Sequence, residues 1–162
     1  MTYDGIQTAC KAPYISVHDL DELLATCENP IMVYVRSEFC GPCKIVDKIL
    51  YSVGNVTVWN HRTDSWGDTC KEPAEVMFGR TKTNGDHYSK GLKKPIRGVH
   101  LDASEEQVAM WAHSHGIDDY PVMAFFKEAD LVDKILGITN NSEDKTKEHL
   151  FHIIESINTN DE

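Results

Sequence analysis

The stretch Cys40-Gly41-Pro42-Cys43 decides the fold, because of the segments that flank it. Upstream, Pro30 to Val35 is a continuous apolar run rich in β-branched residues, which is typical of a strand covered on both faces of a sheet. Downstream, the segment from Lys44 to Ser52 predicts a helix that ends at Gly54-Asn55. Its apolar residues at helical spacing are Ile45, Val46, Ile49 and Leu50. The two cysteines therefore lie where a buried strand is followed by a helix.

A pair of cysteines at a helix start suits disulfide exchange, which needs one ionised thiol and a second thiol within reach. Unpaired backbone N–H groups and the helix dipole stabilise an anion at that place. We therefore expect a lowered pKa at Cys40, which attacks, and a more buried Cys43, which resolves the mixed disulfide. Gly41 is expected to permit the close turn, and Pro42 fixes φ near about −65° where its missing N–H costs little.

Half of a structural zinc site is the alternative interpretation of the motif. A second cysteine pair with similar spacing is absent, since Cys10, Cys27 and Cys70 are isolated in the sequence. The remaining candidate ligands match no closed zinc pattern, so we expect solvated histidines and no metal. Those candidates are His61, Cys70, His87, His113 and His115.

The rest of the chain predicts an α/β protein with a mixed central sheet flanked by helices. A helix over 16–28 is expected to begin at Ser16 as N-cap, and Ser104 to Gln107 fits a capping box before a helix that stops near Gly116. The other expected elements are a strand over 96–101, a hairpin of strands over 122–126 and 131–136, and a helix over about 142–157. The site should lie at the carboxyl end of a strand.

Residues 53–95 interrupt this pattern, and we interpret them as an insertion within a single domain that covers residues 1–162. Little periodicity is visible apart from a strand-like run from Val56 to Trp59. Seven basic and five acidic residues lie between positions 52 and 95, so this segment is net +2 while the remainder is −12. Two interpretations stay open: a basic flap that docks a partner, and a tolerated surface excursion.

Charge and hydropathy exclude other classes of function. The 16 basic residues against 26 acidic ones give a net charge of −10, which disfavours nucleic acid as a partner. No apolar run approaches the ~18 residues of a membrane helix. The N-terminus has neither a basic leader nor an apolar core. These features predict a cytoplasmic protein in which most of the five cysteines are thiols.

With these features together, the sequence resembles the thioredoxin family. The resemblance includes Cys40 to Lys44, the pair Tyr120-Pro121 before an apolar strand, and Gly137, which lies sixteen residues beyond Pro121. It covers about residues 14–53 and 96–157, and it implies a thioredoxin fold with a long insertion after the active-site helix. By that resemblance Pro121 is a cis-proline that faces the cysteines, and the backbone of Tyr120 pairs with an extended substrate.

The resemblance also implies a protein-disulfide reductase that carries electrons in cell redox homeostasis. Such a protein would use no cofactor beyond the redox-active Cys40–Cys43 pair. Its partners would be protein disulfides and an external reductase of the thioredoxin-reductase type. No glycine-rich nucleotide fingerprint is present with which the chain could take electrons itself. A binding subunit with dispensable cysteines is the alternative, and an oxidant or isomerase is a third possibility.

Departures from the family pattern concern the surroundings of the cysteines. Phe39 stands where the family usually has Trp, and Lys48 replaces a proline of the active-site helix. Tyr34 occupies the position of a buried family Asp, and Gly98 that of its Lys partner. Because that carboxylate helps to deprotonate the resolving thiol, we expect slower resolution by Cys43 or a proton path through water and the Tyr34 hydroxyl.

Overall fold

The computed structural model describes residues 14–27, 30–37, 40–56, 76–81 and 90–159. Among these residues, no helix combines the length and the apolar character that crossing a membrane requires. The elements are, in chain order, α2 (Val17–Thr26), β1 (Ile31–Arg36), α3 (Gly41–Val53), β2 (Gly54–Val56), β3 (Val76–Thr81), β4 (Lys90–Asp102), α4 (Glu106–Ser114), β5 (Val122–Lys127), β6 (Asp130–Leu136), η3 (Thr139–Asn141) and α5 (Glu143–Thr159).

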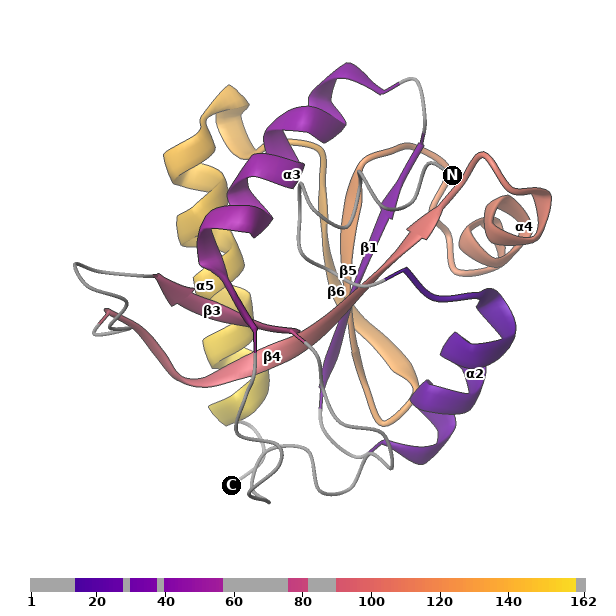
Figure 1. Cartoon of the computed structure of the whole chain (residues 1–162), viewed down its shortest axis with the longest axis horizontal. Coiled ribbons are helices and arrows are strands. Elements are labelled where there is room, and N and C mark those ends of the chain that lie inside the picture. Colours follow the sequence, from indigo (N-terminus) through magenta and orange to yellow (C-terminus); the bar gives the residue numbers. More distant parts are fainter. Residues whose placement is uncertain (1–13, 28–29, 38–39, 57–75, 82–89, 160–162) are drawn as a thin grey trace.

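The strands form one six-stranded mixed sheet in the order β2-β3-β4-β1-β5-β6 (Figure 1). Strand β1 is central and pairs in parallel with β4, while the other neighbouring strands are antiparallel. Since β5 runs against β1, its first residue Val122 pairs with Val35 near the end of β1. The segments that follow β1 and precede β5 therefore leave the sheet at the same edge.

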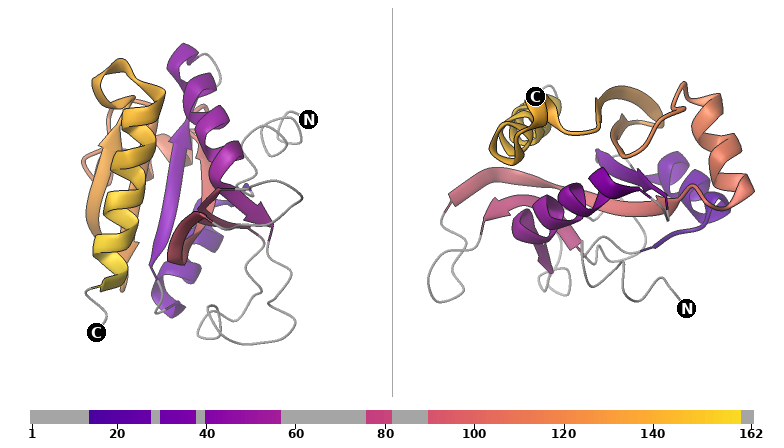
Figure 2. Two further views of the ribbon diagram at one scale, coloured as in Figure 1. Left: turned by 90° about the vertical axis from the view of Figure 1, so that its left-hand side faces the viewer. Right: turned by 90° about the horizontal axis from the view of Figure 1, so that it is seen from above.

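Helices cover both faces of this sheet, α3 and α5 on one face and α2 and α4 on the other. In Figure 1 these two pairs of helices lie on opposite sides of the central strands, and the left view of Figure 2 shows α3 running beside α5. The expected α/β class and the mixed sheet flanked by helices are confirmed.

Strand β1 separates two hydrophobic cores, because successive side chains of a strand point to opposite faces. Met32 and Tyr34 belong to the core beneath α3 and α5. Ile31, Val33 and Val35 belong to the core beneath α2 and α4. This alternation explains why the whole run from Ile31 to Val35 is apolar although no two neighbours share a core.

Several helix boundaries follow the sequence, and one does not. Ser16 caps α2 as expected, since its Oγ accepts a hydrogen bond from the Asp19 N–H at 3.1 Å. The capping box at Ser104 is wrong: the N-cap of α4 is Glu105, without a side-chain capping bond. The Ser104 N–H donates instead to Oδ1 of Asp102 at 2.9 Å, so a local turn around the Asp102 side chain occupies the group that the capping box needed.

The segment after α3 contains more strand structure than the sequence indicated. Strands β2 and β3 and the first residues of β4 extend the sheet within the predicted insertion. Strand β4 begins at Lys90 and continues through Pro95, whereas we expected a start at Ile96. These strands are stabilised by pairing with one another and, through the later residues of β4, with β1, which local periodicity does not reveal. Residues 57–59 of the expected strand-like run lie outside the described residues, and the docking role of the segment stays a prediction.

Candidate active site

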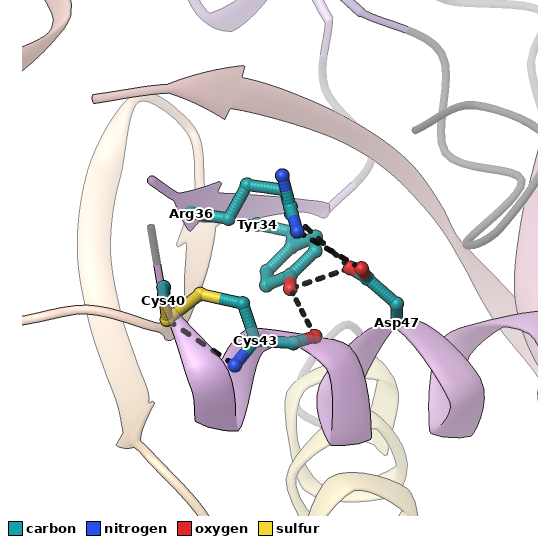
Figure 3. Close-up of polar contacts among 5 residues, drawn as sticks. All are labelled: Tyr34, Arg36, Cys40, Cys43 and Asp47. Atoms are coloured by element: carbon teal, nitrogen blue, oxygen red, sulfur yellow. Dashed lines mark hydrogen bonds and ion pairs between the residues drawn. A yellow bond between two sulfur atoms is a disulfide. The ribbon is translucent and has the colours of Figure 1, made fainter. Parts of the chain in front are cut away.

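Cys40 and Cys43 form a disulfide at the start of α3, with an S–S distance of 2.01 Å and a Cα–Cα distance of 5.2 Å (Figure 3). Cys40 is half-buried and comes directly before the helix, while Cys43 is fully buried within its first turn. This difference in burial agrees with the expected order, in which the more accessible sulfur attacks and the more buried sulfur resolves.

The first turn of α3 places a backbone N–H donor next to the more accessible sulfur, Sγ of Cys40. The N–H of Cys43 lies 3.2 Å from Sγ of Cys40 and also 3.2 Å from the Cys40 carbonyl oxygen. Sγ thus takes the position of an N-cap side-chain acceptor, three residues before the amide that it receives. In the reduced protein the same N–H is placed to stabilise a thiolate at Cys40.

Gly41 and Pro42 occupy the first turn of α3, but the fold does not need glycine at position 41. A Cβ added to Gly41 would meet no atom within 4 Å. Its backbone is also outside the left-handed region, which holds Gly116 and Gly137 instead. Neither steric reason that demands glycine applies at position 41, so the expectation that Gly41 permits the close turn stays a prediction. Pro42 stands within the first turn, where helix N–H groups lack partners in any case.

The bond between Tyr120 and Pro121 is cis, as the resemblance implied. Pro121 precedes β5 and so lies at the edge of the sheet where β1 ends. The spacing to Gly137 has a structural reason: the Gly137 N–H donates to the Pro121 carbonyl at 2.8 Å, and the glycine has φ 67°. Burial and the nearby Asp118 and Asp119 raise the pKa of the Tyr120 hydroxyl, which keeps it neutral.

Behind Cys43 lies a polar network that the sequence analysis missed in part (Figure 3). The Tyr34 hydroxyl is 3.0 Å from the Cys43 carbonyl oxygen and 2.7 Å from Oδ1 of Asp47. Burial, with the negative charge of Asp47, raises the pKa of Tyr34 far above its ordinary value. The phenol therefore stays protonated and acts as a hydrogen-bond donor.

A buried ion pair completes this network. The Arg36 guanidinium places Nη2 at 3.1 Å from Oδ2 of Asp47 and Nε at 3.3 Å from Oδ1. Both residues are only 7% exposed. Burial by itself lowers the pKa of Arg36, but the Asp47 carboxylate and Tyr34 bring it above the ordinary value. Arg36 is thus a permanent cation held by a two-pronged contact.

Two patterns in the sequence could have revealed Arg36 and Asp47. Arg36 follows Met32 and Tyr34 at alternate positions of β1, so it points to the same face. Asp47 lies four residues after Cys43 and three before Leu50, on the buried side of α3. Ile45, which we expected on that side, is 40% exposed because it lies just outside the buried arc of the helix. Tyr34 and Gly98 stand where the family has a buried charge pair. This chain has a different buried charge pair, Arg36 and Asp47, next to Tyr34.

Other sequence candidates lie away from this site or outside the described residues. Cys27 is buried and disulfide-bonded, so the expectation of a thiol is wrong at that position. His113 pairs with Asp118 at the surface, and His115 contacts the Trp111 carbonyl oxygen at 2.9 Å at the end of α4. Outside the described residues lie Phe39, His61, Cys70 and His87.

One group of donor atoms among the described residues could contact a metal ion. It consists of His18, Asp19 and Glu22, whose ligand atoms lie within 4.8 Å of one another on α2. All three side chains are exposed, and none belongs to the site around Cys40. We assign no metal to this group.

Comparison with protein-family models and with curated proteins found no match for the sequence. Solved structures do match. Mitochondrial thioredoxin 3 from Saccharomyces cerevisiae aligns with a TM-score of 0.53 and 14% identity, covering 92% of this chain and 98% of that one. The chain has a thioredoxin fold. Thioredoxin from Malassezia sympodialis gives a TM-score of 0.50 and 17% identity, with coverage of 89% and 90%.

A third thioredoxin-fold match comes from a yeast structure titled for thiol resolution in mitochondrial 1-Cys peroxiredoxin via glutathione/thioredoxin systems. Its TM-score is 0.53 at 13% identity, with coverage of 92% of this chain and 98% of that one. At such low identity the matches establish the thioredoxin fold alone. Function has to be argued from the residues of the site.

Proposed function

We propose that the protein is a thiol-disulfide oxidoreductase that reduces disulfides of other proteins through Cys40 and Cys43. The observation that carries this proposal is the Cys43 N–H at 3.2 Å from Sγ of Cys40 at the start of α3. It supplies a preformed donor for a thiolate, and the second sulfur is already within bonding distance. A protein with dispensable cysteines would have no need of this arrangement.

The reaction proceeds through two exchanges. The Cys40 thiolate attacks one sulfur of the client disulfide, whose S–S bond breaks, and the other client sulfur leaves as a thiolate that takes up a proton. Cys43 then loses its proton to solvent and attacks Sγ of Cys40, which releases the second client sulfur. Two electrons pass from the dithiol to the client, and the Cys40–Cys43 disulfide remains.

Client binding is proposed at the edge of the sheet that carries Pro121. Tyr120 and Pro121 directly precede β5 at the edge of the sheet where β1 ends, and an extended client segment would pair with the Tyr120 backbone there. An external reductase of the thioredoxin-reductase type then returns the two electrons. We propose no bound cofactor beyond the cysteine pair itself.

The compartment is a separate proposal. The sequence favoured the cytoplasm, whereas the disulfide at Cys27 favours a place in which disulfides persist. Labelling of intact cells with a permeant thiol reagent before lysis distinguishes the two. Modified Cys27 supports the cytoplasm, and protected Cys27 supports an oxidising compartment.

Reduction of insulin disulfides by the wild type, Cys40→Ser and Cys43→Ser tests the proposed activity. We expect turnover by the wild type alone, and accumulation of a covalent adduct with Cys43→Ser but not with Cys40→Ser. An inert wild type that still binds a partner through non-covalent contacts would support the alternative of a binding subunit. The adduct formed by Cys43→Ser in a cell extract would identify the client.

A further inference from the structure

The two exchange steps given above use neither Arg36 nor Asp47, yet this ion pair is buried directly behind the cysteines. Arg36 ends the strand that leads to Cys40, and Asp47 lies on the helix that contains Cys43. Burying two charges is unfavourable unless their geometry is good and further hydrogen bonds satisfy them. Both conditions are met here by the forked contact and by the Tyr34 hydroxyl. Apolar side chains would fill this space without the need for a matched geometry and further hydrogen bonds.

The pair is coupled to Cys43 in two ways. Asp47 is four residues beyond Cys43, and side chains at this spacing have Cβ atoms about 5–6 Å apart on one helix face. The Tyr34 hydroxyl contacts both residues, at 3.0 Å from the Cys43 carbonyl and 2.7 Å from the Asp47 carboxylate. Since Cys43 is 0% exposed, charges at this range are weakly screened by water.

We propose that Arg36 and Asp47, held together through Tyr34, are positioning residues that set how readily Cys43 ionises in the resolving step. The proposal rests on the proposed exchange function. A balanced pair exerts a small net field on the Cys43 sulfur. An unbalanced pair would leave a bare charge of one sign beside a thiol that must become an anion, and the two signs act in opposite directions.

Other titratable groups near the Cys43 side of α3 are few among the described residues. His100 and Asp102 on β4 pair in register with Tyr34 and Arg36. The His100 ring contacts Tyr14, and Asp102 accepts the Ser104 N–H. On α5, His149 lies 3.0 Å from Thr139 Oγ1, and Glu143 pairs at 3.8 Å with the exposed Lys48. Asp47 is the carboxylate that shares the face of α3 with Cys43.

The reaction of the reduced protein with Ellman's reagent separates the two exchanges. Attack by Cys40 releases one equivalent of thionitrobenzoate and leaves a mixed disulfide, and resolution by Cys43 releases the second. Stopped-flow absorbance across a range of pH gives the midpoint of each step. The second step is the readout for the ion pair, and the first shows whether the protein exchanges disulfides at all.

We expect Asp47→Asn to leave the Arg36 cation unbalanced and to move the midpoint of the second step to lower pH. Arg36→Gln leaves the Asp47 anion unbalanced and moves that midpoint to higher pH. A single neighbouring charge shifts the midpoint by about one pH unit or more, which is about a tenfold change in the thiolate fraction of Cys43 at a fixed pH below the midpoint. The double variant Arg36→Gln/Asp47→Asn returns toward the wild type.

Matched controls change the same charges near the surface: Lys48→Gln and Glu143→Gln, whose ion pair joins an exposed lysine to a half-buried glutamate. These variants should leave the midpoint of the second step in place. Asp47→Glu keeps the charge and stays near the wild type, and it provides the comparison if Arg36→Gln does not fold. Circular dichroism verifies folding of each variant.

Two failures are distinguishable. A wild type that releases no thionitrobenzoate from Cys40 overturns the proposed exchange function. A wild type with both phases, combined with shifts of the same sign in Asp47→Asn and Arg36→Gln or with shifts no larger than those of the surface controls, overturns the positioning role. If only the Asp47 series folds, equal midpoints for Asp47→Asn and Asp47→Glu overturn it as well.

Discussion

The Tyr34 hydroxyl joins the central strand to the active-site helix through Oδ1 of Asp47, at 2.7 Å. Because Asp47 also holds Arg36 in a forked contact, and the Tyr34 hydroxyl contacts the Cys43 carbonyl as well, strand β1 is tied to α3 by four polar contacts in an otherwise apolar core. The disulfide begins the same helix. The contacts between β1 and α3 therefore hold in place both the polar network and the helix that carries the redox pair.

Removal of the Tyr34 hydroxyl should weaken this support. In Tyr34→Phe the ring still fills the core, but the Asp47 carboxylate and the Cys43 carbonyl lose a donor. We expect a loss of about 1–3 kcal/mol in the free energy of unfolding, typical of a buried acceptor left without its partner. Denaturant unfolding of the oxidised protein measures the change. Stability equal to that of the wild type would show that the hydroxyl contributes nothing there.

Gly41→Ala tests why glycine stands between the cysteines. An added Cβ meets no atom of the chain, so we expect folding to be unaffected or favoured by about 0.4–1 kcal/mol. Reduction of protein disulfides should decline, because the methyl group is added at an exposed position directly after Cys40, while reaction with a small disulfide persists. If Gly41→Ala reduced the protein disulfide and the small disulfide as fast as the wild type does, Gly41 would have no role in the access of protein substrates to Cys40.

The surface pair of His113 and Asp118, at 2.6 Å, should give a small pH dependence of stability. The hydrogen bond and charge of Asp118 raise the pKa of His113 above its ordinary value. Protonation thus favours the folded state, and this contribution is complete below about pH 6.5 and is lost as pH rises through the raised pKa. The difference in melting temperature between wild type and Asp118→Asn should therefore shrink with rising pH. A difference that is constant from acid to alkaline pH would contradict the assignment.

Ile49 and Ile45 offer a matched pair on one helix. Ile49 is fully buried on the inner side of α3, whereas Ile45 on the same helix is 40% exposed. We expect Ile49→Ala to cost about 2–5 kcal/mol in the free energy of unfolding, and Ile45→Ala well under about 1 kcal/mol, as for a surface substitution. Denaturant titration of both variants provides the comparison, and similar losses would mean that α3 is rotated relative to the described packing.

Local patterns were sufficient for the elements that carry their own signals. The apolar run of β1, the cap at Ser16 and the hairpin of β5 and β6 are found where the sequence indicated them. The cis bond at Pro121 came from family resemblance, since composition and spacing have no bearing on it.

Long-range features were missed for a common physical reason. Strands β2 and β3 are held by backbone pairing with one another and with β4, which requires no periodicity in their side chains. In the sequence, Arg36 and Asp47 each look like an ordinary surface charge. They form a buried ion pair only because α3 packs against β1. Neither element on its own indicates that the other will neutralise it.

The most direct test of the exchange mechanism is the pH dependence of alkylation at Cys40 in the reduced protein, with the modified peptide assigned by mass spectrometry. We predict that iodoacetamide modifies Cys40 ahead of Cys43 with a midpoint at least about one unit below the ordinary thiol value of about 8.5. A midpoint at the ordinary value, or a Cys40 that does not react, would contradict the account.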